Sequence, residues 1–322
     1  MFSIILPLYN KAPYVEKTLL SIAKQNFKDF ELIILNDGST DESLETVQHY
    51  IQKNRVLKSL QEKGLLRVIS QKNQGVSVTR NKGANLAKED YLVFIDGDDW
   101  WKVDFLQELS LLIEKCPEAG IYGTSFSKVY KHKTIEADFN LPPDFESGYI
   151  DYCQLYTDNA TEWMPLTSIS VAIKKEVFLK CGEFPKNITM GEDFILWLTI
   201  ALKYKVAFLS KSLAYYNQDI AFNKRSVDKL HIPQNNMIWN FSRFDKEARE
   251  NPKVKRLLDI LRARQLYKYY ISKRYFNEAK KELAKIDWDN VPMKYKVPYK
   301  KNRWVARCIF NCKLVAKSIL RK

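Results

Sequence analysis

The alternation of short apolar runs with segments of helical periodicity constrains this chain more than any other feature of its sequence. Apolar runs lie at 3–8, 31–36, 65–70 and 91–95, and the segments between them carry apolar residues at intervals of three and four. Strands that alternate with helices in this way build parallel sheets through βαβ units. The sequence therefore predicts an α/β fold with helices packed on its sheet.

Acidic turns follow two of these runs. Asp37 comes after the second run, and the motif Asp-Gly-Asp-Asp at 96–99 comes after the fourth. Ligands of open α/β sheets bind at the carboxyl ends of the strands, where both turns would lie. Mg²⁺ and Mn²⁺ prefer oxygen ligands, and proteins often hold them with one or two carboxylates plus substrate phosphates. The motif therefore suits either a metal site or a solvated turn that caps the helix expected near Lys102.

The charge is divided unevenly along the chain. The 322 residues contain 52 Lys and Arg against 38 Asp and Glu, but residues 223–322 hold 27 of the bases and only 9 of the acids. The first 222 residues therefore carry a net charge of −4, and residues 291–322 carry ten bases and no acid. A basic block of this size favours a polyanionic partner, either nucleic acid or an anionic membrane surface.

Five short motifs stand in a fixed order along the first two thirds of the chain. They are IILPLYN at 4–10, LNDGSTD at 35–41, NQG at 73–75 with RN at 80–81, FIDGDD at 94–99, and GEDF at 191–194. This order and spacing resemble the family 2 glycosyltransferases of the GT-A fold, over about residues 1–215. The resemblance implies a Rossmann-like nucleotide-binding sheet flanked by helices, and an inverting transfer of a sugar from a nucleotide diphosphate sugar.

The resemblance also implies roles for individual residues. Asp98, together with Asp96, would bind Mn²⁺ or Mg²⁺, which takes up charge on the leaving nucleoside diphosphate. The guanidinium of Arg80 would face the donor phosphates, to which its geometry is suited. The alternative is that Arg80 is an ordinary charged residue on the surface of a helix. The residues that would contact the nucleotide sugar are Pro7, Leu8, Tyr9, Asp37, Arg80, Asp96 and Gly97.

The matching catalytic base is Asp193, which would take the proton from the acceptor hydroxyl. Acids at this position are also favoured at the amino end of the helix expected over 192–203, because the helix dipole stabilises them there. The neighbouring Glu192 and the aromatic Trp163 are candidate acceptor contacts. Lys224 and Arg225 are candidates for a loop that closes over the diphosphate.

The expected domains follow from the motifs and the charge. Residues 1–222 form the glycosyltransferase domain, with a nucleotide-sugar-binding half at 1–100 and an acceptor-binding half at 101–222. Residues 223–322 form a basic helical C-terminal region. Within it, residues 303–321 place Trp304, Cys308 and aliphatic side chains on one helical stripe, with basic residues over much of the remainder.

A helix of this kind suits the headgroup layer of an anionic membrane, or its apolar stripe packs on the catalytic domain. No nucleic-acid-binding motif accompanies the charge, so we expect no nucleic acid partner. No apolar run reaches the ~18 residues needed to span a bilayer. The absence of a leader and the five scattered cysteines predict a cytoplasmic protein attached to the inner face of the cell membrane.

These inferences predict a metal-dependent inverting glycosyltransferase in cell-surface polysaccharide synthesis. It would move a hexose or N-acetylhexosamine from a nucleotide diphosphate sugar, with UDP as the expected nucleotide, to a glycan acceptor carried on a lipid. The alternative from another class is a noncatalytic nucleotide- or polyanion-binding protein that retains the GT-A scaffold.

Overall fold

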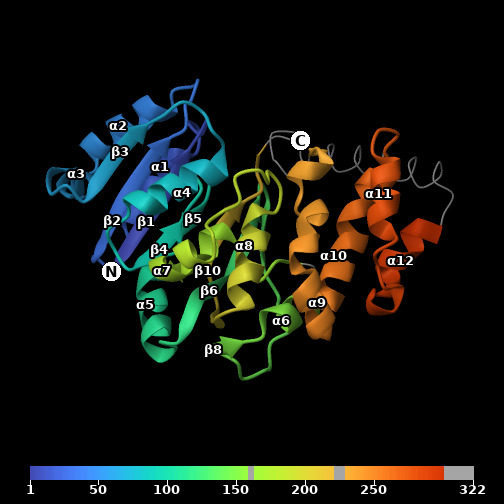
Figure 1. Ribbon diagram of the computed structural model, residues 1–322. Coiled ribbons are helices and arrows are strands. Elements are labelled where there is room, and N and C mark those ends of the chain that lie inside the picture. Colours follow the sequence, from blue (N-terminus) through green and yellow to red (C-terminus); the bar gives the residue numbers. More distant parts are fainter. Residues whose placement is uncertain (159–162, 221–228, 301–322) are drawn as a thin grey trace. The chain divides into compact units, whose positions relative to one another are not determined.

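The computed structural model describes residues 1–158, 163–220 and 229–300, which form two compact units (Figure 1). The first unit takes Met1–Leu155, the described residues up to Lys186, and Asp193–Gln218. The second takes Tyr156–Asp158, Asn187–Glu192 and the described residues from Asp219 onward. The division near the C-terminal region therefore falls after Gln218, and two short segments of the expected acceptor-binding half belong to the second unit.

A mixed sheet forms the centre of the first unit. Its strands are β1 (Phe2–Leu8), β2 (Phe30–Asn36), β3 (Leu66–Ser70), β4 (Tyr91–Phe94), β5 (Trp100–Trp101), β6 (Ala119–Tyr130), β7 (Lys133–Glu136), β8 (Ser147–Ile150), β9 (Val171–Lys174) and β10 (Lys205–Asn217). The main path runs β3-β2-β1-β4-β9-β6-β10-β5, with β7 paired to β6 and β8 paired to β10.

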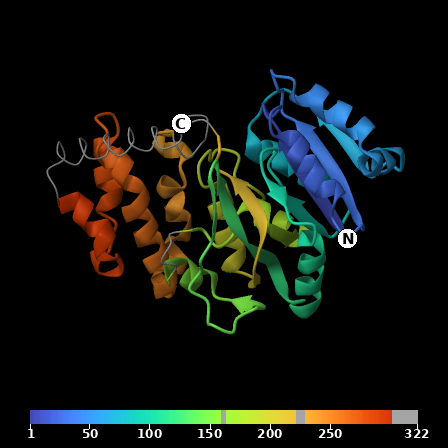
Figure 2. The same ribbon diagram turned by 180° about the vertical axis from the view of Figure 1, so that it is seen from behind.

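The parallel part of this sheet confirms the βαβ pattern read from the sequence. The strands β3, β2, β1 and β4 are parallel neighbours, and β1 and β2 are almost wholly buried along their lengths. Burial on both faces is why these strands read as continuous apolar runs rather than as alternating ones. Beyond β4 the sheet turns antiparallel at β9, and the view from behind shows the arrows of β6 and β10 side by side (Figure 2).

The helices complete both units. The helices of the first unit are α1 (Val15–Ala23), α2 (Ser43–Lys53), α3 (Arg55–Glu62), α4 (Val76–Leu86), α5 (Phe105–Lys115), α6 (Tyr152–Asp158), η1 (Ser168–Ser170), α7 (Lys175–Lys180) and α8 (Glu192–Ala201). The last three residues of α6 and the first residue of α8 are assigned to the second unit. The helices of the second unit are η3 (Pro233–Asn235), η4 (Met237–Phe244), α9 (Asp245–Glu250), α10 (Pro252–Tyr270), α11 (Phe276–Leu283), η5 (Trp288–Asn290) and α12 (Met293–Lys300).

Helix α4 packs closely on the parallel strands because it carries a glycine at the point of contact. A Cβ on Gly83 would lie 2.5 Å from Cγ2 of Ile5 on β1 and 3.0 Å from Cδ1 of Leu35 on β2. This helix carries Arg80 one turn before the contact, so the close packing fixes the position of that guanidinium relative to the strands.

The second unit is helical, as its composition predicts. Its longest helix, α10, contains the fully buried Asp259, whose carboxylate pairs with Lys255 and accepts a hydrogen bond from Asn290. Arg262 is also buried and lies within 3.7 Å of Glu282 on α11. Two of the few acids of this basic region therefore hold its interior together. None of the described helices is both long enough and apolar enough to cross a bilayer.

At the amino ends of the parallel strands, one buried carboxylate ties three elements together. Glu31 on β2 is 2% exposed and accepts hydrogen bonds from Ser3 on β1, from the backbone N–H of Lys88, and from Arg67 on β3, at 2.6 to 2.7 Å. Burial alone would raise the pKa of Glu31, but these partners lower it overall. The carboxylate therefore stays ionised and stabilises the edge opposite the acidic turns.

We expect Glu31→Gln to lower the free energy of unfolding by about 2–3 kcal/mol at pH 7, because Arg67 and two further donors lose a buried anionic acceptor. A depressed carboxyl pKa contributes stability above the unfolded value that is lost as the pH falls through the folded value. The gap between wild type and variant should therefore shrink below about pH 4.5. Urea unfolding across pH measures it, with the exposed Glu45→Gln as the control; a gap independent of pH would contradict this assignment.

Candidate functional site

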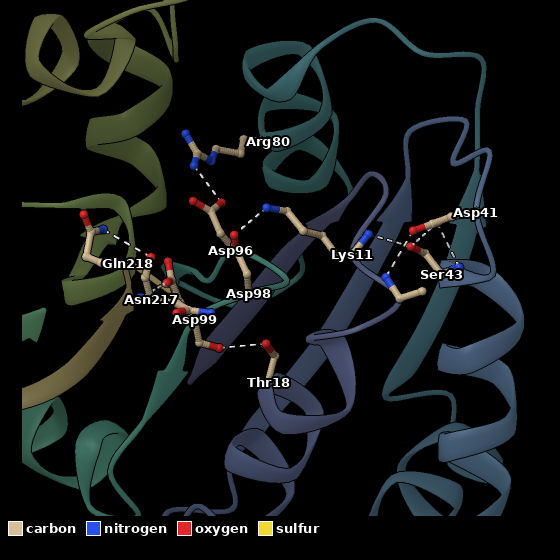
Figure 3. A network of polar contacts seen from close by, with 11 residues as sticks. Lys11, Thr18, Asp41, Ser43, Arg80, Asp96, Asp98, Asp99, Asn217 and Gln218 are labelled. Atoms are coloured by element: carbon tan, nitrogen blue, oxygen red, sulfur yellow. Dashed lines mark hydrogen bonds and ion pairs between the residues drawn. The ribbon is translucent and has the colours of Figure 1, made fainter. Parts of the chain in front are cut away.

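The carboxyl ends of three neighbouring strands bring the motif residues together. Lys11 follows β1, Asp37 follows β2, and the motif at 96–99 follows β4, with β1 lying between the other two strands. Figure 3 shows the polar contacts of Lys11 and of the motif at 96–99. The prediction that these motifs meet at one edge of the sheet is therefore confirmed by the topology.

Arg80 points into this network rather than into solvent. Its guanidinium lies 2.8 Å from Oδ1 of Asp96, and its side chain is 5% exposed. The guanidinium carbon lies 5.3 Å from the ring centroid of Phe184, which provides an aromatic surface for the cation. Arg80 is therefore not the ordinary helix surface charge that its sequence position also allowed.

Phe184 is held in place from helix α4. The side chain of Asn81 donates to the backbone oxygen of Phe184 and accepts from its backbone N–H, at 2.8 and 3.0 Å. The ring of Phe184 packs edge-on against Phe94, the last residue of β4, at 5.2 Å. One buried aromatic thus fixes both Arg80 and the strand that leads to its partner Asp96.

Asp98 is paired with a lysine from the neighbouring strand end. Nζ of Lys11 lies 2.5 Å from Oδ2 of Asp98, whose side chain is 10% exposed. Burial raises the pKa of Asp98, the charge of Lys11 opposes this rise, and repulsion from Asp96 adds to it, with a raised value as the result. The ion pair therefore only partly offsets the cost of removing this carboxylate from water.

Asp99 is the most deeply buried of the three carboxylates. Its Oδ1 accepts the backbone N–H of Asn217 at 2.7 Å, and the hydroxyl of Thr18 donates to its backbone oxygen. Its Oδ2 has no hydrogen-bond partner among the described residues. Burial, followed by repulsion from Asp98 and Asp96, raises the pKa of Asp99 well above its ordinary value.

The charge balance of this cluster fits a divalent cation. Within the described residues three carboxylates face two cations, Lys11 and Arg80, and one buried carboxylate oxygen is unpaired. No three His, Cys, Asp or Glu side chains of the described chain are gathered to hold an ion by themselves. Asp98 and Asp96 would therefore hold the ion together with ligands from outside the protein, as phosphate oxygens provide for Mg²⁺ and Mn²⁺.

Asp37 has a structural task in this arrangement. It is 3% exposed, and its carboxylate accepts the backbone N–H groups of Gln74 and Gly75, both at 2.9 Å, and the side-chain amide of Gln71 at 2.8 Å. Gly75 has φ +89°, so the loop before α4 bends in a conformation that favours glycine. Asp37 therefore shapes this loop, and its contact with the nucleotide stays a prediction.

The remaining predicted donor contacts lie around the same strand ends. Leu8 is buried and its backbone oxygen accepts from the N–H of Asp37 at 2.8 Å, whereas Tyr9 is 46% exposed and Pro7 is half-buried. Gly97 lies against the aliphatic stem of Lys11, with 3.2 Å between Cγ and the place where a Cβ would stand. These residues surround the cluster, and their contacts with a donor stay predictions.

Asp193 lies at the amino end of α8, where its Oδ1 accepts the backbone N–H of Phe194 at 2.8 Å. Trp197 is four residues further on and shares its helical face. The ring of Trp197 packs on Phe184 at 5.6 Å, the same ring that supports Arg80. Helix α8 therefore packs on the same aromatic ring that supports Arg80. Glu192, the residue before it, is the last residue of its segment in the second unit.

The other predicted contacts are less well supported. Trp163 is 9% exposed, packs on Phe126 at 5.3 Å, and has the ammonium of Lys128 at 4.1 Å from its ring centroid. Little of its ring surface is left for a sugar. Lys224 and Arg225 lie outside the described residues.

Sequence reasoning missed two residues of this site, Lys11 and Phe184. Lys11 directly follows the first motif, so its position beside a strand end was a usable signal. Phe184 offered no such signal, because its contact with Arg80 depends on a loop distant in sequence.

Comparisons with known proteins identify a family of similar sequences. The family model described as "Glycosyl transferase family 2" matches residues 3–162. A putative teichuronic acid biosynthesis glycosyltransferase of Bacillus subtilis, TuaG, is 27% identical over 77% of this chain and 96% of its own length. An uncharacterised glycosyltransferase of the same organism, EpsJ, is 32% identical over 47% of this chain but only 40% of EpsJ.

Solved structures share the fold. S. aureus TarS 1–349 in complex with UDP-GlcNAc has a TM-score of 0.59 and 19% identity, over 88% of this chain and 70% of that one. The Pyrobaculum calidifontis mannosyltransferase PcManGT, in complex with GDP-Man and Mn²⁺, has a TM-score of 0.52 and 20% identity, over 88% of this chain and 74% of that one. At these identities the likeness shows a shared GT-A fold.

The observed role of Asp37 gives a local test. We expect Asp37→Ala to lower the free energy of unfolding by about 2–3 kcal/mol, because two backbone N–H groups and an amide lose an anionic acceptor. Hydrogen exchange of the Gln74 and Gly75 amides should accelerate more than exchange elsewhere in the sheet. Asp37→Asn keeps one acceptor oxygen, so its free energy of unfolding should lie between those of wild type and Asp37→Ala. Unchanged protection of both amides in the alanine variant would refute this role.

Proposed function

Through residues 3–162 this chain belongs to glycosyl transferase family 2, and from that premise we propose that it is a metal-dependent, inverting glycosyltransferase. The observation that carries the proposal is the cluster of Asp96, Asp98 and Asp99 at the end of β4. Asp98 and Asp99 are buried, the three carboxylates outnumber their paired cations, and one buried oxygen of Asp99 has no hydrogen-bond partner among the described residues. Such a cluster favours binding of a cation.

The ion would be Mn²⁺ or Mg²⁺, held by Asp98 and Asp96. When bound together with the donor, it supplies Lewis-acid stabilisation of the charge that develops on the leaving nucleoside diphosphate. Arg80 lies beside this position, pre-oriented by Asp96 and Phe184. Its planar guanidinium is suited to phosphate oxygens, so we assign it to the donor diphosphate.

Asp193 is the base in this proposal. Its carboxylate takes the proton of the acceptor hydroxyl while that oxygen forms a bond to the anomeric carbon. The bond from the anomeric carbon to the diphosphate oxygen breaks, and its electron pair leaves with the diphosphate. Attack from the face opposite the leaving group inverts the anomeric configuration. The position of Asp193 at the amino end of α8, a helix whose Trp197 packs on the same Phe184 ring as Arg80, supports this role.

The donor we propose is a UDP-linked hexose or N-acetylhexosamine. TarS, which shares the fold, was crystallised with UDP-GlcNAc, and PcManGT was crystallised with GDP-Man and Mn²⁺. The acceptor we propose is a lipid-linked glycan in cell-surface polysaccharide synthesis. The likeness to TuaG, named for teichuronic acid biosynthesis and aligned over nearly its whole length, supports this context.

We also propose that the C-terminal region attaches the enzyme to the inner face of the cell membrane. Helix α12 exposes Met293 (60%) and Val297 (43%) four residues apart, next to Lys294, Lys296 and Lys300. Asp259 and Glu282 are occupied within the interior of the unit, so they do little to offset its surface cations. The stripe expected over 303–321 lies outside the described residues. The thiols of Cys116, Cys153 and Cys181 suit a reducing cytoplasm.

Two variants test the catalytic assignment. Asp193→Asn should lower turnover about 10²- to 10⁴-fold, the usual contribution of a general base, while leaving UDP affinity unchanged. Asp98→Asn should instead abolish the dependence of UDP binding on Mn²⁺. Donor hydrolysis and transfer to a glycan acceptor measure turnover, calorimetry measures UDP binding, and the exposed Glu45→Gln is the control. Binding of UDP without any turnover, indifferent to Asp193, would favour a noncatalytic nucleotide-binding protein.

Charge reversal tests the membrane assignment in the full chain. The triple variant Lys294→Glu, Lys296→Glu and Lys300→Glu should sediment with phosphatidylserine vesicles about 10- to 100-fold less, since each lysine near an anionic surface contributes ~1 kcal/mol. The matched control reverses three exposed lysines of the first unit, Lys53, Lys58 and Lys63. Equal partitioning of the two triple variants would contradict a membrane-binding role for α12.

A further inference from the structure

Lys11 supplies the cation nearest to Asp98, and none of the motif roles includes it. Its Nζ lies 2.5 Å from Oδ2 of Asp98, and its aliphatic stem runs along Gly97. A side chain at position 97 would meet that stem at 3.2 Å. The glycine between the two acids therefore leaves the space through which the lysine reaches Asp98.

The backbone of Lys11 is fixed from the acidic turn after β2. Its N–H donates to Oγ of Ser43 at 2.6 Å, and the next N–H, of Ala12, donates to Asp41 at 3.3 Å. Asp41 in turn accepts from the N–H and the hydroxyl of Ser43. Asn10, with φ +52°, bonds through its side chain to Thr40. The contact between Lys11 and Asp98 thus belongs to a built arrangement, as Figure 3 shows.

The ion pair between Lys11 and Asp98 is largely shielded from solvent. The lysine side chain is 29% exposed and the aspartate side chain 10%. An ammonium at 2.5 Å from Oδ2 occupies the space in which a divalent ion would coordinate that oxygen.

We propose that Lys11 is a resident counter-ion of Asp98, which holds the carboxylate in place while donor and metal are absent and which the divalent ion must displace. This inference rests on the proposed function, because it assigns Asp98 to the metal. It follows that the ion alone binds weakly, since it must break an ion pair. It binds better with a diphosphate, whose oxygens give the released ammonium a new partner.

Direct Mn²⁺ binding to the metal-stripped full chain tests this inference without relying on turnover. Free Mn²⁺ is measured by electron paramagnetic resonance, first with Mn²⁺ alone and then with UDP added. Lys11→Met should bind Mn²⁺ alone about tenfold more tightly than wild type, the equivalent of ~1.4 kcal/mol. Lys11→Gln, which removes the charge but keeps a hydrogen-bond donor, should behave similarly. Addition of UDP should reduce the difference in Mn²⁺ affinity between these variants and wild type.

Two controls separate charge at this position from charge in general. Lys11→Arg keeps the cation and should retain the weak binding of Mn²⁺ alone. Lys24→Met removes an equal charge from the exposed end of α1 and should match wild type. Thermal unfolding of each variant with chelator establishes that it is folded before binding is measured.

The outcomes distinguish this inference from the proposed function. If wild type binds Mn²⁺ in the presence of UDP, but Lys11→Met and Lys11→Gln bind Mn²⁺ alone no more tightly than wild type, only the counter-ion role is overturned. If wild type binds no Mn²⁺ with or without UDP, the metal dependence and the counter-ion role both fall.

Discussion

The burial of Asp98 and Asp99 beside the partly exposed Asp96, directly after β4, is the constraint on which this site depends. A buried carboxylate is costly unless it is paired and hydrogen-bonded. The protein provides Arg80 for Asp96, Lys11 for Asp98 and a backbone N–H for Asp99. These contributions come from α4, from the turn after β1 and from the end of β10. Three elements that are distant in sequence therefore meet at this short motif.

The buried carboxylates at the two edges of the parallel sheet differ in how completely they are hydrogen-bonded. At the amino edge, both oxygens of Glu31 are satisfied and the pKa of Glu31 is lowered. At the carboxyl edge, Oδ2 of Asp99 has no partner within the described part of the chain, and the pKa values of Asp98 and Asp99 are raised. A carboxylate with all its hydrogen bonds made stabilises the fold, whereas a buried carboxylate that lacks partners favours binding of a further cation. The second arrangement is the one expected where a ligand binds.

The sequence predicted the elements that depend on local pattern and missed the contacts that depend on tertiary distance. Apolar runs located β1 to β4 within one residue at each end, and the signal is most continuous for β1 and β2, which are buried along nearly their whole length. The meeting of the 96–99 motif with the strand ends followed from parallel topology. The orientation of Arg80 did not, because it depends on Phe184, about a hundred residues away. The covered ring of Trp163 likewise depends on Phe126 and Lys128, which no periodicity connects to it.

The basic C-terminal region, read from composition as an appendage, is joined to the predicted catalytic base through the chain itself. The segment Asn187–Glu192 belongs to the second unit, where backbone hydrogen bonds link Thr189 and Met190 to residues 235–237. Gly191 has φ +83°, and a Cβ there would lie 2.3 Å from Sδ of Met237. That glycine is therefore required both by its backbone conformation and by packing within the helical unit. The chain passes directly from this segment into Asp193, the first residue of the last segment of the first unit.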